Sequence, residues 1–385
     1  MRSFLMLPIL LCVLGGTGYY LARRLHRGIA SFAPTVHFWP VLLGVGVLLI
    51  LLILSFARSL LPFPAAIRHV LGVIGAACMG VALYGLLYTV AADLLLLVPR
   101  LLKLPFVAHR LFNGFVALAV VIGTLATCFG GYLRANQVKH VAYTVELQGK
   151  QELDDLRVVM ISDLHLGAVG SEGRLKKVVA AINAEQPDVV CIAGDFFDTD
   201  FGAIQNPDAA LTTLHELRAT YGVYACLGNH DGGATFPQMV DFLERANIRL
   251  LADESVVVDQ RFVLVGRLDA SAIGGYGDQT RKPLSDVLHT EDAALPVIVL
   301  DHNPAHIDEY GADVDLVLCG HTHQGQVFPA NLLTKRMYTV DYGAYRKDAQ
   351  SPQVIVSSGV GSWGMPLRVG THCEIVTICF QTSHS

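Results

Sequence analysis

The chain has 385 residues, of which 52% are hydrophobic and 16% charged, with a formal net charge of −5. Charged residues make up about a quarter of an ordinary soluble protein, so part of this chain belongs in a lipid bilayer. The composition excludes a disordered chain and a disulfide-stabilised miniprotein, and without a basic domain it indicates no nucleic-acid partner.

Charge is distributed unevenly along the chain. Residues 1–133 hold nine Lys/Arg and one Asp, whereas residues 134–385 hold nineteen Lys/Arg and thirty-two Asp/Glu. We therefore divide the chain into a transmembrane region, 1–133, a linker with a leading strand, 134–153, and a water-soluble domain, 154–385.

Four uncharged runs in the first region are long enough to cross a bilayer as helices, which takes about 20 residues. They are Phe4–Leu21, Val36–Ala57, Val70–Ala92 and Leu111–Leu133. We expect a multi-pass membrane protein and name the lipid bilayer as its partner. Asp93 follows the third run, and we interpret it as an interfacial residue beside Arg100.

The side of the membrane is ambiguous from the sequence. The loops after the first and third runs hold six Lys/Arg and the opposite side holds five, which favours an extracytoplasmic C-terminal domain by one residue. The five cysteines of that domain show no pairing pattern and favour a reducing compartment instead.

The soluble domain alternates short, β-branched apolar runs with amphipathic stretches, which is typical of a layered α/β fold. Helices are predicted around three apolar stripes, Leu175–Ile182, Leu211–Leu217 and Met239–Leu243. Strands are predicted at Arg157–Ile161, Val189–Ile192, Val223–Leu227, Phe262–Val265, Val297–Leu300, Val314–Leu318, Val354–Ser357 and Glu374–Cys379.

Clusters of Asp, His and Asn directly follow five of these strands. The clusters are Ser162–His165, Gly194–Asp198, Gly228–Asp231, Asp301–Asn303 and Gly320–His323. Each cluster alone suits a structural turn, but five strand ends carrying costly polar groups by coincidence is improbable. Open α/β sheets bind ligands at the carboxyl ends of their strands, so we expect one site there.

Carboxylate, amide and imidazole donors without thiolate favour manganese, iron or zinc. Asp163 and His165 lie two residues apart, as do His321 and His323, so each pair can face one site from extended backbone. Gly194, Gly228 and Gly320 precede the candidate ligands, where a missing Cβ permits close backbone approach. We therefore expect a metal centre.

The order Asp-x-His, Gly-Asp-x-x-Asp, Gly-Asn-His-Asp, a later His and Gly-His-x-His resembles the calcineurin-like metallophosphoesterase superfamily over residues 155–380. The later Gly325-Gln326, Ser357–Gly361 and Pro366–Arg368 resemble its membrane-anchored branch, the transmembrane proteins with a metallophosphoesterase domain. Gln324 departs from that branch, in which many members have Gly. The resemblance implies four transmembrane helices followed by a layered α/β/β/α calcineurin-like phosphoesterase domain.

The resemblance also implies a two-metal hydrolase that cleaves a phosphoester or pyrophosphate bond by attack of a metal-activated hydroxide. It places Asp163, His165, Asp195 and His323 on one ion, and Asp195, Asn229, His302 and His321 on the other. His230 would act as the catalytic acid toward the leaving oxygen. Asp231 would orient His230 or serve the turn, and Asp198 would support the ligand histidines or the turn.

The substrate is less legible in the sequence. The segment Phe328–Tyr345 follows the last motif and is interpreted as a lip at which a lipid headgroup could dock. Arg267, Arg281 and Arg368 are among the candidates for a second phosphate contact.

Two other functional classes are open. One is a binding or regulatory module on the same fold, which would lack metal residues that are all present here. The other is a transporter or channel, against which stand the absence of intramembrane charges other than Asp93 and the absence of a broken-helix signal.

Overall fold

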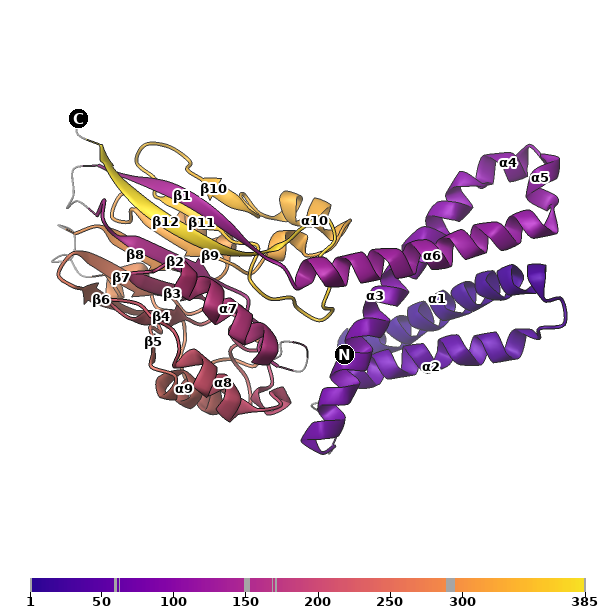
Figure 1. Cartoon of the computed structure of the whole chain (residues 1–385), viewed down its shortest axis with the longest axis horizontal. Coiled ribbons are helices and arrows are strands. Elements are labelled where there is room, and N and C mark those ends of the chain that lie inside the picture. The colour runs from indigo at the N-terminus through magenta and orange to yellow at the C-terminus, as the bar shows by residue number, and fades with distance from the viewer. Residues whose placement is uncertain are drawn as a thin grey trace. The chain divides into compact units, whose positions relative to one another are not determined.

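The computed structural model describes the chain except residues 1, 59–60, 62, 149–152, 168, 170–171, 289–294 and 384–385. The chain divides into two compact units, Met1–Tyr132 (unit 1) and Leu133–Ser385 (unit 2) (Figure 1). Unit 1 is helical, and unit 2 combines two sheets with helices.

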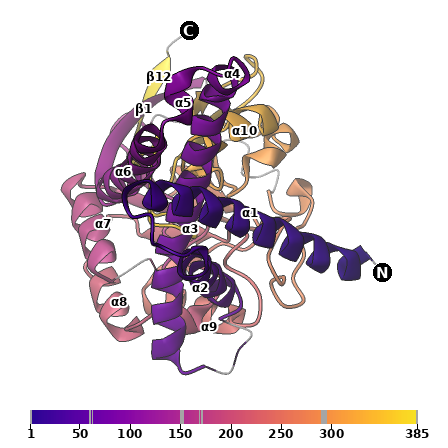
Figure 2. The same cartoon turned by 90° about the vertical axis from the view of Figure 1, so that its right-hand side faces the viewer.

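Unit 1 is built from long helices (Figure 2). Three of them, α2, α3 and α6, are long and apolar enough to cross a membrane. The remaining predicted span, Phe4–Leu21, is the first in the chain and lies within α1. Helix α1 is not among the three candidate spans, and its first side chains lie outside the described residues. The helices are α1 Arg2–Phe32, α2 Phe38–Phe56, α3 Ala65–Leu95, α4 Leu97–Leu101, α5 Pro105–Ala108 and α6 Arg110–Ala135.

Asp93 lies in a polar cluster near the end of α3. Arg100 donates a hydrogen bond to its Oδ1 at 3.1 Å, and Tyr20 donates one to its Oδ2 at 2.6 Å. Arg24 forms an ion pair with the same carboxylate. The predicted proximity of Asp93 to Arg100 is confirmed.

Two six-stranded sheets form unit 2, and both contain parallel strands next to one another. The first has the order β1 (Val138–Gln148), β12 (Cys373–Ser383), β2 (Arg157–Ile161), β3 (Val189–Ala193), β4 (Val223–Cys226), β5 (Ile248–Leu250). The second has the order β10 (Gly343–Tyr345), β11 (Gln353–Val356), β9 (Leu316–Cys319), β8 (Val297–Leu300), β7 (Phe262–Gly266), β6 (Glu254–Val258).

Alternating side chains of the strands enter two different cores. Met160 of β2 and Leu318 of β9 belong to the core between the sheets, whereas Val159 and Ile192 face the core beneath α7, α8 and α9. These helices cover one face of the first sheet in Figure 1, and their bounds are Glu172–Ala184, Pro207–Leu214 and Phe236–Arg245.

The outer face of the second sheet packs against short 3₁₀ helices and loops in the described residues. A third core joins strand residues such as Val299 and Val317 to Val287 and Ile307 of these segments. The second outer layer is therefore thinner than the predicted α/β/β/α arrangement.

The eight predicted strands are present, and most of their ends lie within two residues of the predicted ones. The last strand, β12, extends furthest, to Ser383, because it pairs with β1 along its whole length. The short strands β5, β6 and β10 and helix α10 (Ala330–Met337) were not predicted as elements.

Candidate metal centre

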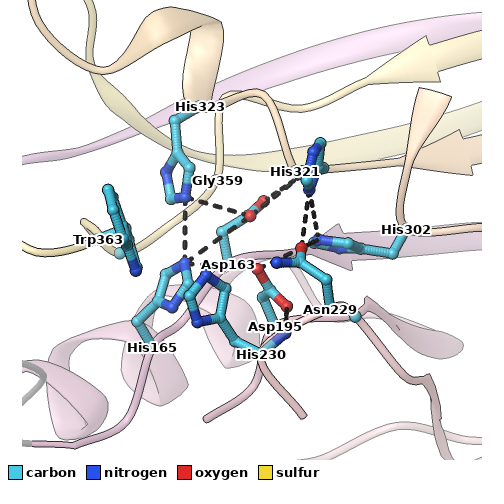
Figure 3. A network of polar contacts seen from close by, with 12 residues as sticks. Asp163, His165, Asp195, Asn229, His230, His302, His321, His323, Gly359 and Trp363 are labelled. Carbon is cyan, nitrogen blue, oxygen red and sulfur yellow. Dashed lines mark hydrogen bonds and ion pairs between the residues drawn. The ribbon is translucent and has the colours of Figure 1, made fainter. Parts of the chain in front are cut away.

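The polar clusters of the sequence meet at the carboxyl ends of the strands. Asp163 and His165 follow β2, Asp195 follows β3, and Asn229 follows β4. His302 follows β8 of the second sheet, and His321 and His323 follow β9. Figure 3 shows these side chains turned toward one another.

One group of candidate ligands contains Asp163, His165 and His323, whose donor atoms lie within 4.8 Å of one another. The Nε2 atoms of His165 and His323 are 3.1 Å apart. Oδ1 of Asp163 lies 3.3 Å from Nε2 of His323. All three residues are buried.

A second group contains Asp195, His302 and His321. Oδ2 of Asp195 lies 3.2 Å from Nε2 of His302 and 3.7 Å from Nε2 of His165, so this carboxylate reaches both groups. Oδ1 of Asn229 lies 2.9 Å from Nδ1 of His321 and 3.2 Å from Nε2 of His302.

The protonation of the site suits a cation. Burial lowers the pKa of His165 to about 3 and that of His321 to about 4, so both rings are neutral near pH 7 and each offers a lone pair. Nδ1 of His165 is buried and has no hydrogen-bond partner among the described residues. Several atoms with lone pairs therefore lie close together with few hydrogen-bond donors between them. A divalent metal ion binds to such a set of lone-pair donors.

Asp195 and His302 form an ion pair at the centre of this arrangement. Burial opposes both charges, but the attraction between them lowers the pKa of Asp195 and raises that of His302 well above its usual value. Burial raises the pKa of Asp163 to about 6. The positive charge on His302 thus compensates the negative charge of Asp195. A metal ion bound at the same position would also compensate that charge.

The backbone of the candidate ligands is strained. Five of the seven have positive φ angles, between 49° and 70°, in the left-handed region that non-glycine residues avoid. Such conformations cost of order 1–3 kcal/mol each and gather at functional sites. The five are Asp163, His165, Asp195, His321 and His323.

The glycines before the ligands have the predicted close approaches. A Cβ on Gly228 would lie 2.3 Å from both the backbone N and Oδ1 of Asp195. On Gly320 it would lie 2.4 Å from Oδ2 of Asp163, and on Gly194, at φ +76°, it would lie 2.6 Å from the ring of His302. The ligand side chains occupy the space that a Cβ would fill.

The comparisons identify the kind of protein that carries this site. A model of the calcineurin-like phosphoesterase family matches residues 156–325. A protein from Aquifex aeolicus, named uncharacterized metallophosphoesterase, is 31% identical over 264 residues, which cover 69% of this chain and 98% of that protein. The chain belongs to the calcineurin-like phosphoesterase family. Its predicted enzyme class, a phosphoric ester hydrolase, is confirmed, and the family uses divalent metal ions.

Other relatives of this phosphoesterase are longer than the region they share with it. A Campylobacter jejuni protein named uncharacterized metallophosphoesterase is 34% identical over 251 residues, covering 64% of this chain and 63% of its own length. A Danio rerio protein named transmembrane protein with metallophosphoesterase domain is 30% identical over 279 residues, covering 69% and 62%. The chain thus aligns with less than two thirds of each.

His230 lies at the edge of the site and is half-buried. Its backbone N–H donates to Oδ1 of Asp195 at 2.8 Å, and its Nδ1 lies 2.6 Å from Oγ1 of Thr199. Its ring meets that of His165 edge to face, with ring centroids 5.1 Å apart. The structure therefore brings His230 beside the candidate ligands, with Nε2 free of partners among the described residues. Thr199 was missed because a lone threonine four residues after Asp195 carries no motif signal.

The two supporting carboxylates have different surroundings. The oxygens of Asp231 accept hydrogen bonds from the backbone N–H groups of Phe197 and Gly228, each at 2.8 Å, an arrangement that favours the structural role in the turn. Thr199 contacts the ring of His230. Asp198 offers an oxygen within 4.8 Å of ring nitrogens of His165 and His230, and its support of a ligand histidine stays a prediction.

Three arginines considered for substrate phosphate have other partners. Arg267 is fully buried and pairs with Asp253 at 2.8 Å, and Arg281 pairs with Asp301 at 2.8 Å. Arg368 is fully buried and donates to the carbonyl oxygens of His323 at 3.0 Å and Gly361 at 2.6 Å. Arg368 thus joins two loops behind the candidate ligands, and each of the three guanidinium groups already has a partner in the protein.

Gln324 also has a left-handed backbone, at φ +54° and ψ +30°. A glycine would adopt this conformation without strain, which explains why Gly suits the position. The loop therefore keeps the conformation that Gly favours, although the side chain differs.

Proposed function

We propose that this protein is a binuclear metal-dependent phosphoesterase in which Asp195 is shared between two ions. The observation that carries the proposal is the pair of donor groups that meet at Asp195, whose Oδ2 lies 3.2 Å from His302 and 3.7 Å from His165. Asp163, His165, Asp195 and His323 would hold one ion, and Asp195, Asn229, His302 and His321 would hold the other.

Two divalent ions in this site would lower the pKa of a water molecule and neutralise negative charge on the phosphoryl oxygens. The oxygen and nitrogen donors suit manganese, iron or zinc. The chain's own contribution is to hold the donors in fixed, strained positions before substrate arrives, so little reorganisation is needed.

His230 would serve the leaving group. The hydroxyl of Thr199 fixes Nδ1, and the backbone N–H bond to Asp195 fixes the position of the residue, so Nε2 can donate a hydrogen bond or a proton to the departing oxygen. The ring of Trp363, centred 5.7 Å from that of His230, covers one side of it.

The metal dependence is tested on the full chain in detergent micelles, stripped of metal and re-supplied with manganese, iron or zinc. Hydrolysis of p-nitrophenyl phosphate and of bis(p-nitrophenyl) phosphate distinguishes monoesters from diesters. We expect metal-dependent turnover that Asp195→Asn abolishes and that Asp278→Asn, an exposed acid elsewhere, preserves. Equal turnover in the metal-stripped enzyme would reject the proposal.

We further propose that the substrate is linked to a lipid. Eight large apolar side chains are exposed in the described part of unit 2, and five of them lie in the segments that follow or flank the Gly-His-x-His loop. Exposed apolar groups gathered in this way mark an interaction surface. We call this set the apolar lip: Phe328, Leu332, Leu333, Met337 and Trp363.

The apolar lip is continuous with the candidate metal centre. Oε1 of Gln326 accepts a hydrogen bond from the backbone N–H of Trp363 at 2.8 Å, which ties the two segments together. The ring of Tyr338, at the end of α10, is centred 6.1 Å from that of His321. Lys335 and Arg336 are exposed on the same helix and would attract an anionic lipid surface.

The lipid link is tested by comparing two variants. Leu332→Ser/Leu333→Ser weakens the lip, and Val257→Ser removes an exposed apolar side chain elsewhere in the unit. With phosphatidic acid or phosphatidylglycerol in vesicles as substrate, we expect the first variant to lose at least tenfold in turnover and the second to lose little. Both should cleave p-nitrophenyl phosphate like the wild type. If the first variant lost as much turnover on p-nitrophenyl phosphate as on the lipid, the proposal that the lip binds lipid would be rejected.

We also propose that α1 completes four membrane spans and that unit 2 is extracytoplasmic. The support is the uncharged run Phe4–Leu21 and the Lys/Arg distribution, six against five. A C-terminal alkaline phosphatase fusion, which is active only outside the cytoplasm, tests the side. An inactive alkaline phosphatase fusion together with a fluorescent C-terminal green fluorescent protein fusion would contradict an extracytoplasmic unit 2.

A further inference from the structure

A cavity of about 540 Å³ lies among the helices of unit 1. Its walls come from α1, α2, α3, α4 and α6, and most of them are apolar, with Leu49, Val81 and Val120 as examples. The volume falls within the range of about 300–1,000 Å³ that is usual for ligand sites.

The charged side chains of the cavity are gathered at one end of the bundle. Arg24 and Arg27 lie in the last third of α1, Asp93 lies near the end of α3, Arg100 lies in α4, and Arg110 begins α6. Consecutive long helices run in opposite directions through a membrane, so the ends of α1 and α3 and the start of α6 share one side. The cavity therefore has a basic end and an apolar interior.

The single acid does not balance the four arginines. Asp93 pairs with Arg24 and Arg100. Arg110 donates to the backbone carbonyl oxygen of Ala30 at 2.7 Å, which satisfies a donor without neutralising the charge. Arg27 has no hydrogen-bond or ion-pair partner for its guanidinium among the described residues. The described lining residues thus carry three positive charges in excess at one end of an apolar cavity, and two of these arginines, Arg27 and Arg110, are exposed there.

We propose that this cavity binds one anionic lipid, with a phosphate headgroup among the arginines and an acyl chain in the apolar interior. Guanidinium groups bind phosphate through paired, charge-assisted hydrogen bonds, which accounts for the arginine-rich end. The apolar walls account for a chain, because a free phosphate ion would leave them without a partner. All lining residues belong to unit 1, so the site shares no residue with the candidate metal centre.

The tail half of the site is tested with glycine variants. Gly85 lines the cavity, and a Cβ there would meet no atom within 4 Å, so Gly85→Leu is chosen to reduce the cavity volume. Gly46→Leu is the matched control, because Gly46 also has open space but does not line the cavity. Delipidated full chain in detergent is titrated with 1-palmitoyl-2-oleoyl phosphatidic acid, and bound lipid is counted by native mass spectrometry.

We expect one phosphatidic acid per chain, with affinity at least tenfold weaker in Gly85→Leu and unchanged in Gly46→Leu. Phosphatidylcholine with the same chains should bind at least tenfold more weakly than phosphatidic acid, and millimolar inorganic phosphate should not displace the lipid. Equal binding of the two lipids, or full binding by Gly85→Leu, would overturn the proposal. Displacement by inorganic phosphate would show an anion site without a tail and would overturn it as well.

The headgroup half is tested with Arg27→Gln/Arg110→Gln against Arg23→Gln. Arg23→Gln removes one positive charge from α1, the helix that carries Arg27, but Arg23 does not line the cavity, and its Nη1 contacts Tyr19. The double variant should lose phosphatidic acid binding at least tenfold, and the control should keep it. If the double variant melts at a lower temperature, Arg27→Gln alone carries the test, since its guanidinium has no described partner to lose. Wild-type binding by Arg27→Gln would then contradict the headgroup assignment.

Discussion

Replacing Gly228 with alanine tests whether close backbone packing sets the position of Asp195. The new Cβ would lie 2.3 Å from the backbone N and Oδ1 of Asp195, whereas ordinary contacts begin at 3.4 Å. Asp195 or its loop would have to move by about 1 Å to relieve the overlap, and a misplacement of this size costs about 100-fold in rate. Overpacking also costs about 1–3 kcal/mol of stability. Gly228→Ala should therefore lose most of its activity and bound metal, although it removes no ligand.

Gly311→Ala is the matched control. A Cβ on Gly311 would meet no atom within 4 Å, and its φ is outside the positive range. This variant should keep its activity and gain up to about 1 kcal/mol, because alanine restricts the unfolded chain. Metal content by mass spectrometry and turnover of p-nitrophenyl phosphate are measured on both variants. Wild-type metal content and turnover in Gly228→Ala would refute the packing argument.

Two further predictions concern stability, measured by hydrogen exchange in β3 and β4 of the full chain. Asp231→Asn should cost about 2 kcal/mol, because the amide cannot accept from both Phe197 and Gly228, and an unchanged protection of these strands would contradict this role. Burial lowers the pKa of His321 from its usual 6.5 to about 4. As the pH falls from 6.5 to 4, the His321 ring is therefore protonated in the unfolded chain before it is protonated in the fold, and the metal-free fold loses stability. His321→Asn should remove up to about 3 kcal/mol of that loss, and identical pH profiles for the variant and wild type would show that the ring titrates normally.

The sequence was informative about the candidate site because its residues follow parallel strands. A buried apolar strand such as Val189–Ala193 is recognisable from its composition, and the residue after it is then fixed at the edge of the sheet. Asp195 and His302 come from different sheets, yet both were expected in one place on this ground. The strained backbone of the ligands has no comparable signal in the sequence, because the residue types of Asp163 and His323 do not indicate a positive φ.

Contacts between distant segments were the other gap. The role of Asp231 depends on which backbone N–H groups come near it, and that is set by packing of the turn after β4 against the turn after β3. Arg368 resembles a surface cation in the sequence, but its burial depends on the meeting of loops 323–326 and 359–361. Helix α10 was missed because its Leu and Met side chains face outward and give no core-facing stripe.

The number of metal ions per chain tests the central claim most directly. Full chain in detergent is loaded with manganese or zinc, freed of excess metal, and assayed for metal by mass spectrometry and for turnover of p-nitrophenyl phosphate in the same sample. We expect two ions per wild-type chain, and at most one in Asp195→Asn with turnover lost, because Asp195 reaches both donor groups. Two ions and undiminished turnover in Asp195→Asn would contradict this claim.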